Sequence, residues 1–85
     1  MEKPIRLSGH AIEQCKERGV KIEEVIEAIE NGSQEPAKNN RIMSKLNFQY
    51  NDYWHDSFYS IKQVAPVFIE EEKEIVVFTI FSYYF

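Results

Sequence analysis

The spacing of hydrophobic positions changes along the chain and predicts helices first and strands afterwards. Ile22, Val25, Ile26 and Ile29 recur at i, i+3, i+4 and i+7, which is typical of one buried side of a helix. Beyond residue 41 the apolar residues occur in longer runs bounded by polar turns, which is typical of strands. This change predicts a helical hairpin over residues 8–32 and an antiparallel sheet over residues 41–85.

The two predicted helices have clear start and stop residues. The first runs from Gly9 to Arg18, with Ser8 as its N-cap and Gly19 after its end. The second covers Ile22–Asn31 and ends at Gly32. Helices of about three turns are marginal in isolation, so both are expected to pack on the sheet.

Three segments of the second half read as strands: Arg41–Tyr50, Ser57–Ile69 and Glu74–Phe85. The connections Asn51–Asp56 and Glu70–Lys73 are short and polar, which favours antiparallel hairpins. The fold class predicted for residues 1–85 is therefore α+β. It is a single domain with two N-terminal helices packed on one face of a three- to four-stranded antiparallel meander.

Side chains alternate between the two faces of a sheet, so a predicted register assigns each residue to a face. We take Tyr50 opposite Ser57, and Ile69 opposite Glu74. The face expected under the helices comprises Ile42, Ser44, Leu46, Phe48, Tyr50, Tyr59, Ile61, Gln63, Ala65, Val67, Ile69, Val76, Phe78, Ile80, Ser82 and Tyr84. The face expected to be open comprises Arg41, Met43, Lys45, Asn47, Gln49, Phe58, Ser60, Lys62, Val64, Pro66, Phe68, Ile75, Val77, Thr79, Phe81, Tyr83 and Phe85.

The predicted open face combines three cations, Arg41, Lys45 and Lys62, with aromatic rings. Cations beside stacking surfaces are typical of single-stranded nucleic acid binding, and the hydroxyls of Thr79 and Tyr83 are expected to orient a substrate there. Two alternatives stay open. The polar residues are ordinary for the outer face of an antiparallel sheet, and the aromatic last strand suits a homodimer or a protein partner.

Composition narrows the class of protein. The chain has 85 residues, 44% of them hydrophobic, and a formal charge of −4, which fits one globular domain and argues against a strongly basic coat. Its one cysteine, Cys15, makes no internal disulfide, and a zinc cage is not expected, so we predict no metal and no cofactor. No apolar run is long enough to span a bilayer, and the start MEKPIR lacks a signal-peptide core, so a cytoplasmic location is expected.

Particular residues resemble a known family. They are Ser8-Gly9-His10-Ala11-Ile12-Glu13-Gln14, Glu17-Arg18-Gly19-Val20, Trp54, Tyr59, Lys62-Gln63-Val64, Pro66, Glu70-Glu71, Ile75-Val76-Val77, Thr79 and Tyr83-Tyr84-Phe85. In these positions the chain resembles the domain-of-unknown-function 4258 family, in a bacterial branch. That family is similar to the barnase, EndoU, colicin and RelE group of small metal-independent endoribonucleases. The resemblance implies a RelE/barnase-like fold, activity on RNA, and an antitoxin-like partner for members that are toxin domains.

Three residues are candidates for metal-free RNA cleavage. His10 has a side chain suited to acid–base work near neutral pH, and it shares a helix stripe with Gln14 and Arg18, which is expected to hold a phosphate. Lys62 is expected to neutralise developing phosphate charge. The alternatives are that His10 bonds locally in its helical turn, that Arg18 pairs with Gln14 or Glu17, and that Lys62 is a solvated strand residue.

The sequence therefore supports two functions. The first is a metal-independent endoribonuclease-like or RNA-binding domain of toxin type, whose partner is single-stranded RNA. The second is a non-catalytic interaction module that homodimerises or binds an antitoxin-like protein through its aromatic last strand.

Overall fold

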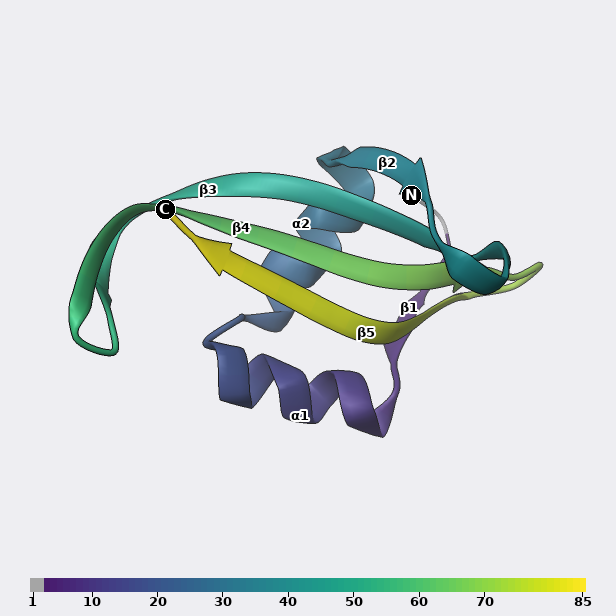
Figure 1. Ribbon diagram of the computed structural model, residues 1–85. Helices are drawn as coiled ribbons and strands as arrows, with labels where there is room; N and C mark the ends of the chain where they lie inside the picture. Colours follow the sequence, from purple (N-terminus) through teal and green to yellow (C-terminus); the bar gives the residue numbers. More distant parts are fainter. Residues whose placement is uncertain (1–2) are drawn as a thin grey trace.

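The computed structural model describes residues 3–85, so the first two residues of the predicted domain lie outside the described range. Two helices pack against one side of a five-stranded, strongly twisted sheet (Figure 1). The elements are β1 (Ile5–Leu7), α1 (Gly9–Arg18), α2 (Ile22–Asn31), β2 (Ser33–Pro36), the short 3₁₀ helix η1 (Lys38–Asn40), β3 (Ile42–Trp54), β4 (Ser57–Glu70) and β5 (Ile75–Tyr84).

Both helices have the bounds that the sequence predicts. The Ser8 hydroxyl accepts a hydrogen bond from the backbone N–H of Ala11 at 3.1 Å, which caps the start of α1. Gly19 follows its end in a left-handed conformation, with φ +68°. In α2, Val25 and Ile29 of the predicted apolar side are buried, and Ala28 is buried beside them. Ile26 is half-buried, and Ile22 in the first turn is exposed, so the prediction holds only from Val25 onwards.

The sheet has the order β1-β5-β4-β3-β2 and is mixed, which corrects the predicted meander of three or four antiparallel strands. Strands β2 to β5 pair antiparallel with their neighbours, whereas β1 pairs in parallel with the start of β5. The two strands that the sequence did not predict have three and four residues. Segments this short show too little alternation to be recognised before their partner strand is known.

The first hairpin is longer than predicted and contains a bulge. Strand β3 continues to Trp54, and only His55 and Asp56 turn, whereas the prediction placed a loop over 51–56. The register shifts between Gln49 and Asp52, where two residues of β3 lie opposite one of β4. One of the two, Asn51, has φ +50°, a left-handed conformation that asparagine adopts more readily than most residues.

A second register shift lies in the β4–β5 pair. Val67 pairs with Thr79 but Phe68 pairs with Val77, so Phe78 is the extra residue. Each bulge exchanges the two faces for the residues beyond it. Consequently β5 from Thr79 to Tyr84 lies on the predicted face because two parity errors cancel. The faces of β4 between Ile61 and Ile69, and those of β5 between Ile75 and Val77, were assigned wrongly.

The core lies between the helices and the corrected inner face of the sheet. Val64, Phe68, Ile75 and Val77, all predicted to be open, are buried there. They pack with Ala11, Cys15, Val20, Val25, Ala28, Ile29 and Ile80. Burial of Cys15 raises the pKa of its thiol, which fits the role of a small core residue.

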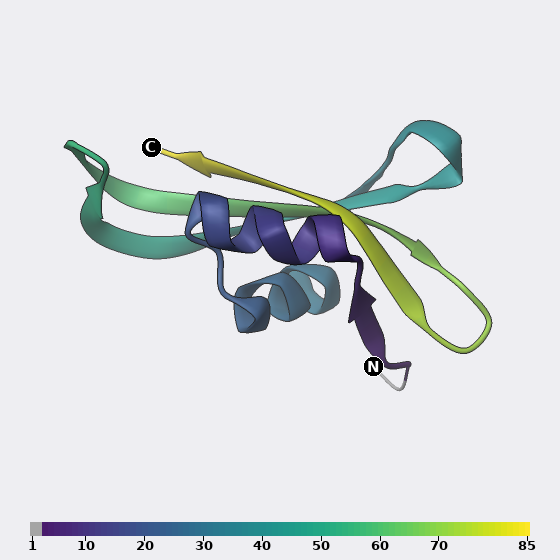
Figure 2. The same ribbon diagram turned by 90° about the horizontal axis from the view of Figure 1, so that it is seen from below.

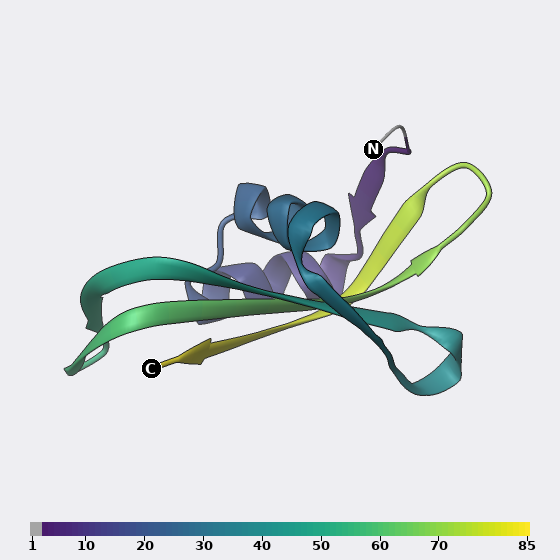
Figure 3. The ribbon, with the colours of Figure 1, turned by 90° about the horizontal axis from the view of Figure 1, so that it is seen from above.

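Figures 2 and 3 show the sheet edge-on, with both helices on one side of it. The turn from β2 through η1 to β3 projects to the other side, whereas the β4–β5 turn bends towards the helix side, near β1. Within residues 3–85, no helix has both the length and the apolar character needed to cross a membrane.

Candidate nucleic-acid interface

The open face is the side of the sheet turned away from the helices. It is defined here as Arg41, Met43, Lys45, Asn47 and Gln49, then Ile61, Gln63, Ala65 and Val67, then Thr79, Phe81 and Tyr83. The hydrogen bond from Nε2 of Gln63 to Oδ1 of Asn47, at 2.9 Å, crosses this face between β4 and β3. Gln63 was expected on the face beneath the helices, and the bulge in β3 is the reason that it lies on the open face.

The four predicted substrate-binding residues, Arg41, Lys45, Thr79 and Tyr83, all belong to the open face. They are not equivalent in their contacts. Lys45 lies 3.5 Å from Oε1 of Glu35 on the neighbouring β2, so its charge is partly balanced. Tyr83 is 45% exposed near the end of β5.

Arg41 and Thr79 line the same hollow, which we call the Arg41 pocket. It has a volume of about 510 Å³ and is bounded by Glu35, Lys38, Arg41, Met43, Val67, Thr79 and Phe81, together with other residues of the segment from β2 through η1. The segment that projects from the open side in Figure 2, from β2 through η1, forms its outer wall. Lys38 on this wall was not predicted as a site residue, because the sequence shows it only as one polar residue in a loop.

Arg41 has an unusual environment. Its Nε is buried and makes no hydrogen bond with any described residue, and its Cζ lies 4.1 Å from the centre of the Phe78 ring. Among residues 3–85, neither Arg41 nor Lys38 forms an ion pair. The pocket therefore has two cations without an ion-pair partner, beside apolar and aromatic walls. Its one lining carboxylate, Glu35, pairs with Lys45.

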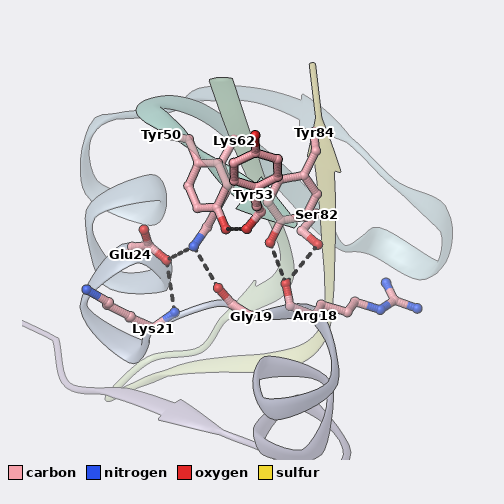
Figure 4. Close-up of polar contacts among 9 residues, drawn as sticks. All are labelled: Arg18, Gly19, Lys21, Glu24, Tyr50, Tyr53, Lys62, Ser82 and Tyr84. Atoms are coloured by element: carbon pink, nitrogen blue, oxygen red, sulfur yellow. Dashed lines mark hydrogen bonds and ion pairs between the residues drawn. The ribbon is translucent and has the colours of Figure 1, made fainter. Parts of the chain in front are cut away.

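Lys62 lies beneath the helices, which corrects its predicted place on the open face. Its Nζ is 2.7 Å from Oε1 of Glu24 in α2 and donates to the backbone carbonyl of Gly19 at 2.7 Å (Figure 4). The third side of the ammonium faces the Tyr50 ring, 5.6 Å away. Only 3% of Lys62 is exposed, so it joins the α1–α2 turn to the sheet.

The same cluster satisfies the end of α1. The hydroxyl of Tyr84 donates to the carbonyl of Arg18 at 2.7 Å, and Ser82 reaches the same oxygen at 3.5 Å. The last carbonyls of a helix have no partner within the helix, so these contacts replace water there. Trp54 stacks on Tyr84 with ring centres 4.9 Å apart. Burial raises the pKa of Tyr84 to about 12.

The three catalytic candidates are not brought together. His10 is exposed in the first turn of α1, and Lys62 is enclosed under the sheet. Nη1 of Arg18 donates to the carbonyl of Ile80 at 2.9 Å, and its Cζ lies 5.5 Å from the Phe81 ring. In Figure 4 the Arg18 side chain extends away from the Lys62 cluster. Arg18 thus reaches the rim of the open face, where it adds a cation.

Comparison with protein families gives a match. The family model described as "Domain of unknown function (DUF4258)" matches residues 7–82. No curated protein and no solved structure matches. Among the described residues, no group of three or more histidine, cysteine, aspartate or glutamate side chains is placed to hold a metal ion.

Proposed function

The chain belongs to the DUF4258 family, whose description leaves function open, and from the geometry of the open face we propose that it binds single-stranded RNA there. The proposal rests on the distribution of positive charge over the open face. Arg18, Lys38 and Arg41 surround Phe81 without a carboxylate ion partner, while Lys45 lies further along β3. Local positive charge attracts the phosphate backbone, and exposed rings stack on bases.

The net charge of −4 is compatible with this proposal, because most of the acidic residues lie on the two helices or in the β4–β5 turn. Glu35 lines the Arg41 pocket, but its carboxylate pairs with Lys45. Glu70, Glu71, Glu72 and Glu74 belong to the β4–β5 turn region, which bends towards the helix side in Figure 3. Electrostatic steering depends on the local potential near the binding surface rather than on the sum over the chain.

Salt-dependent binding of a short, fluorescein-labelled single-stranded RNA tests the proposal. Fluorescence anisotropy is measured from about 50 to 200 mM salt, where phosphate contacts weaken measurably. Lys38→Gln and Arg41→Gln should each weaken binding and lower the salt slope by about 1. Lys16→Gln is the matched control, since Lys16 is exposed on α1 beside Glu13. Absence of binding at low salt, or equal weakening by the control, would refute the proposal.

Cleavage is assayed with the same RNA on a denaturing gel. The resemblance to barnase- and RelE-type ribonucleases stays a prediction and is the reason for this assay, with His10→Ala as the variant. We do not include Lys62 among the groups that contact RNA, because its ammonium is enclosed by Glu24 and Gly19. If the RNA binds and is not cleaved, the chain is an RNA-binding domain without ribonuclease activity on this RNA.

The second candidate function is self-association through the end of β5. Beyond its short pairing with β1, no described strand lies on the outer side of β5. Four exposed aromatic side chains lie at the end of β5 or on the β3–β4 hairpin: Tyr53, Phe58, Tyr83 and Phe85. Light scattering should then show a dimer that Phe85→Ser dissociates, whereas a monomer at all concentrations excludes this function.

A further inference from the structure

The Arg41 pocket has the composition of a small-ligand site rather than of a simple surface depression. Its volume of about 510 Å³ lies within the range of roughly 300–1,000 Å³ that is usual for such sites. Met43 and Val67 provide an apolar floor, and Thr79 provides a hydroxyl. Cations, a hydrogen-bonding group and apolar walls therefore meet in one concave place.

The guanidinium of Arg41 indicates that the ligand of this pocket is an anion. Arg41 lines the pocket and forms no ion pair within residues 3–85, so its positive charge is left for a bound anion to balance. The Phe78 ring, 4.1 Å away, stabilises the cation but does not supply an acceptor in the plane of the guanidinium. A phosphate oxygen satisfies such a group well, since arginine matches phosphate geometry with two parallel hydrogen bonds.

The other walls distinguish a nucleotide from a bare phosphate ion. A bare anion needs only Arg41 and Lys38, which leaves the apolar floor and the Phe81 ring without a role. A nucleobase has a flat face that stacks on an aromatic ring, and ribose hydroxyls pair with a hydroxyl such as that of Thr79. The pocket thus offers one end to a phosphate and the other to a base.

We propose that the Arg41 pocket holds one nucleotide unit, with its phosphate at Arg41 and Lys38 and its base against Phe81. This inference rests on the proposed binding of single-stranded RNA. It identifies the place where one base of the bound RNA turns away from its neighbours and inserts into the protein. It gives Thr79 a role in contacting the sugar. It also explains why β2 and η1 project over the open face and do not lie flat, because together they form the pocket wall (Figure 2).

A nuclear magnetic resonance titration of the ¹⁵N-labelled chain tests the inference. Uridine 5′-monophosphate and adenosine 5′-monophosphate are added separately, and uridine and inorganic phosphate serve as the two halves of the ligand. We expect shifts confined to the amides of Lys38, Thr79 and Phe81 and to the Nε–H signal of Arg41. Each half should bind at least tenfold more weakly than the whole nucleotide.

Two variants distinguish specific binding in the pocket from attraction by the overall positive charge of the open face. Arg41→Lys keeps the charge but loses the paired hydrogen bonds, and should weaken nucleotide binding at least tenfold. Thr79→Val keeps the side-chain shape and should weaken it a few-fold. The spectrum of each variant reports whether the fold is retained, and Lys16→Gln should bind the nucleotide as the wild type does.

The outcomes discriminate between the two proposals. If the nucleotides cause no shifts in the pocket at millimolar concentration while RNA still binds with a steep salt dependence, the pocket assignment fails and the RNA proposal stands. Inorganic phosphate binding as tightly as the nucleotides would also overturn the assignment, in favour of an anion site. Nucleotide binding without RNA binding would keep the pocket and refute the RNA proposal.

Discussion

The ammonium of Lys62 lies 2.7 Å from a carboxylate oxygen of Glu24, under the helices and on the side of the sheet opposite Arg41. This ion pair connects the middle strand of the sheet to the first turn of α2. Its Lys62 side chain is 4% exposed and its Glu24 side chain 19%. Such a pair holds the helical hairpin on the sheet and takes no part in the open face.

Lys62→Met should destabilise the fold by about 2–4 kcal/mol, since loss of one partner leaves the other charge poorly compensated. Urea unfolding measures the change. The matched control is Lys45→Met, which removes the partly exposed lysine paired with Glu35 and should cost less than about 1 kcal/mol. Lys62→Met combined with Glu24→Leu should cost less than the sum of the two single variants. Equal effects of Lys62→Met and Lys45→Met would contradict the assigned burial.

The helices were predictable because each carries its own start and stop residues. Ser8 and Gly19 mark the boundaries of α1 through local backbone chemistry that needs no information about the rest of the fold. Gly32 follows α2 in an extended conformation, with φ −81°. The apolar side of α2 likewise follows from its own spacing. The bounds of both helices therefore agree with the structure at every residue.

The faces of the sheet were predictable only in part, because one extra residue reverses them. Asn51 gives a weak local signal for the first bulge, since it can adopt positive φ, but Phe78 gives none for the second. The placement of Lys62 failed for this reason, while Arg41 and Thr79 stayed on the predicted face. The pocket was not predictable, because its wall at Lys38 depends on how β2 pairs with β3.

Gly19→Ala should destabilise the fold by about 2–4 kcal/mol. A left-handed residue other than glycine costs about 1–2 kcal/mol, and the added Cβ would clash with a ring carbon of Trp54. Thermal or urea unfolding measures the loss. Gly9→Ala is the control, because nothing lies within 4 Å of its Cβ position. In a Trp54→Ala background the cost of Gly19→Ala should fall towards the conformational part, although the Tyr84 hydroxyl still lies 3.2 Å from the Cβ position. An unchanged cost would exclude the close contact with Trp54.

Gln14→Leu should destabilise strand β5 at Ile80. Oε1 of Gln14 accepts a hydrogen bond from the backbone N–H of Ile80 at 2.8 Å, and Arg18 donates to the carbonyl of the same residue. Loss of the amide leaves a buried N–H unpaired, at a cost of about 1–3 kcal/mol. Hydrogen exchange of the Ile80 amide should accelerate. Glu13→Leu, at an exposed position of the same helix, should leave that exchange rate unchanged, and a similar acceleration there would point to fraying of α1 instead.

Tyr84→Phe should change how stability depends on alkaline pH. The pKa of Tyr84 is raised from 10 to about 12, chiefly by burial and then by Tyr50, so the folded state retains a proton that the unfolded state releases. Stability from this group is therefore complete below pH 10 and is lost as pH rises towards 12. Below pH 10 the variant should be less stable by about 1 kcal/mol, because the hydrogen bond to the Arg18 carbonyl is gone. Urea unfolding at pH 9 and pH 11 should show the difference between wild type and variant shrinking, since at pH 11 the unfolded wild type is stabilised by releasing the Tyr84 proton and the variant has no such proton. Tyr83→Phe, at the exposed neighbouring position, should show the same difference from wild type at both values, and a constant gap for Tyr84→Phe would mean that its hydroxyl is not held in the cluster.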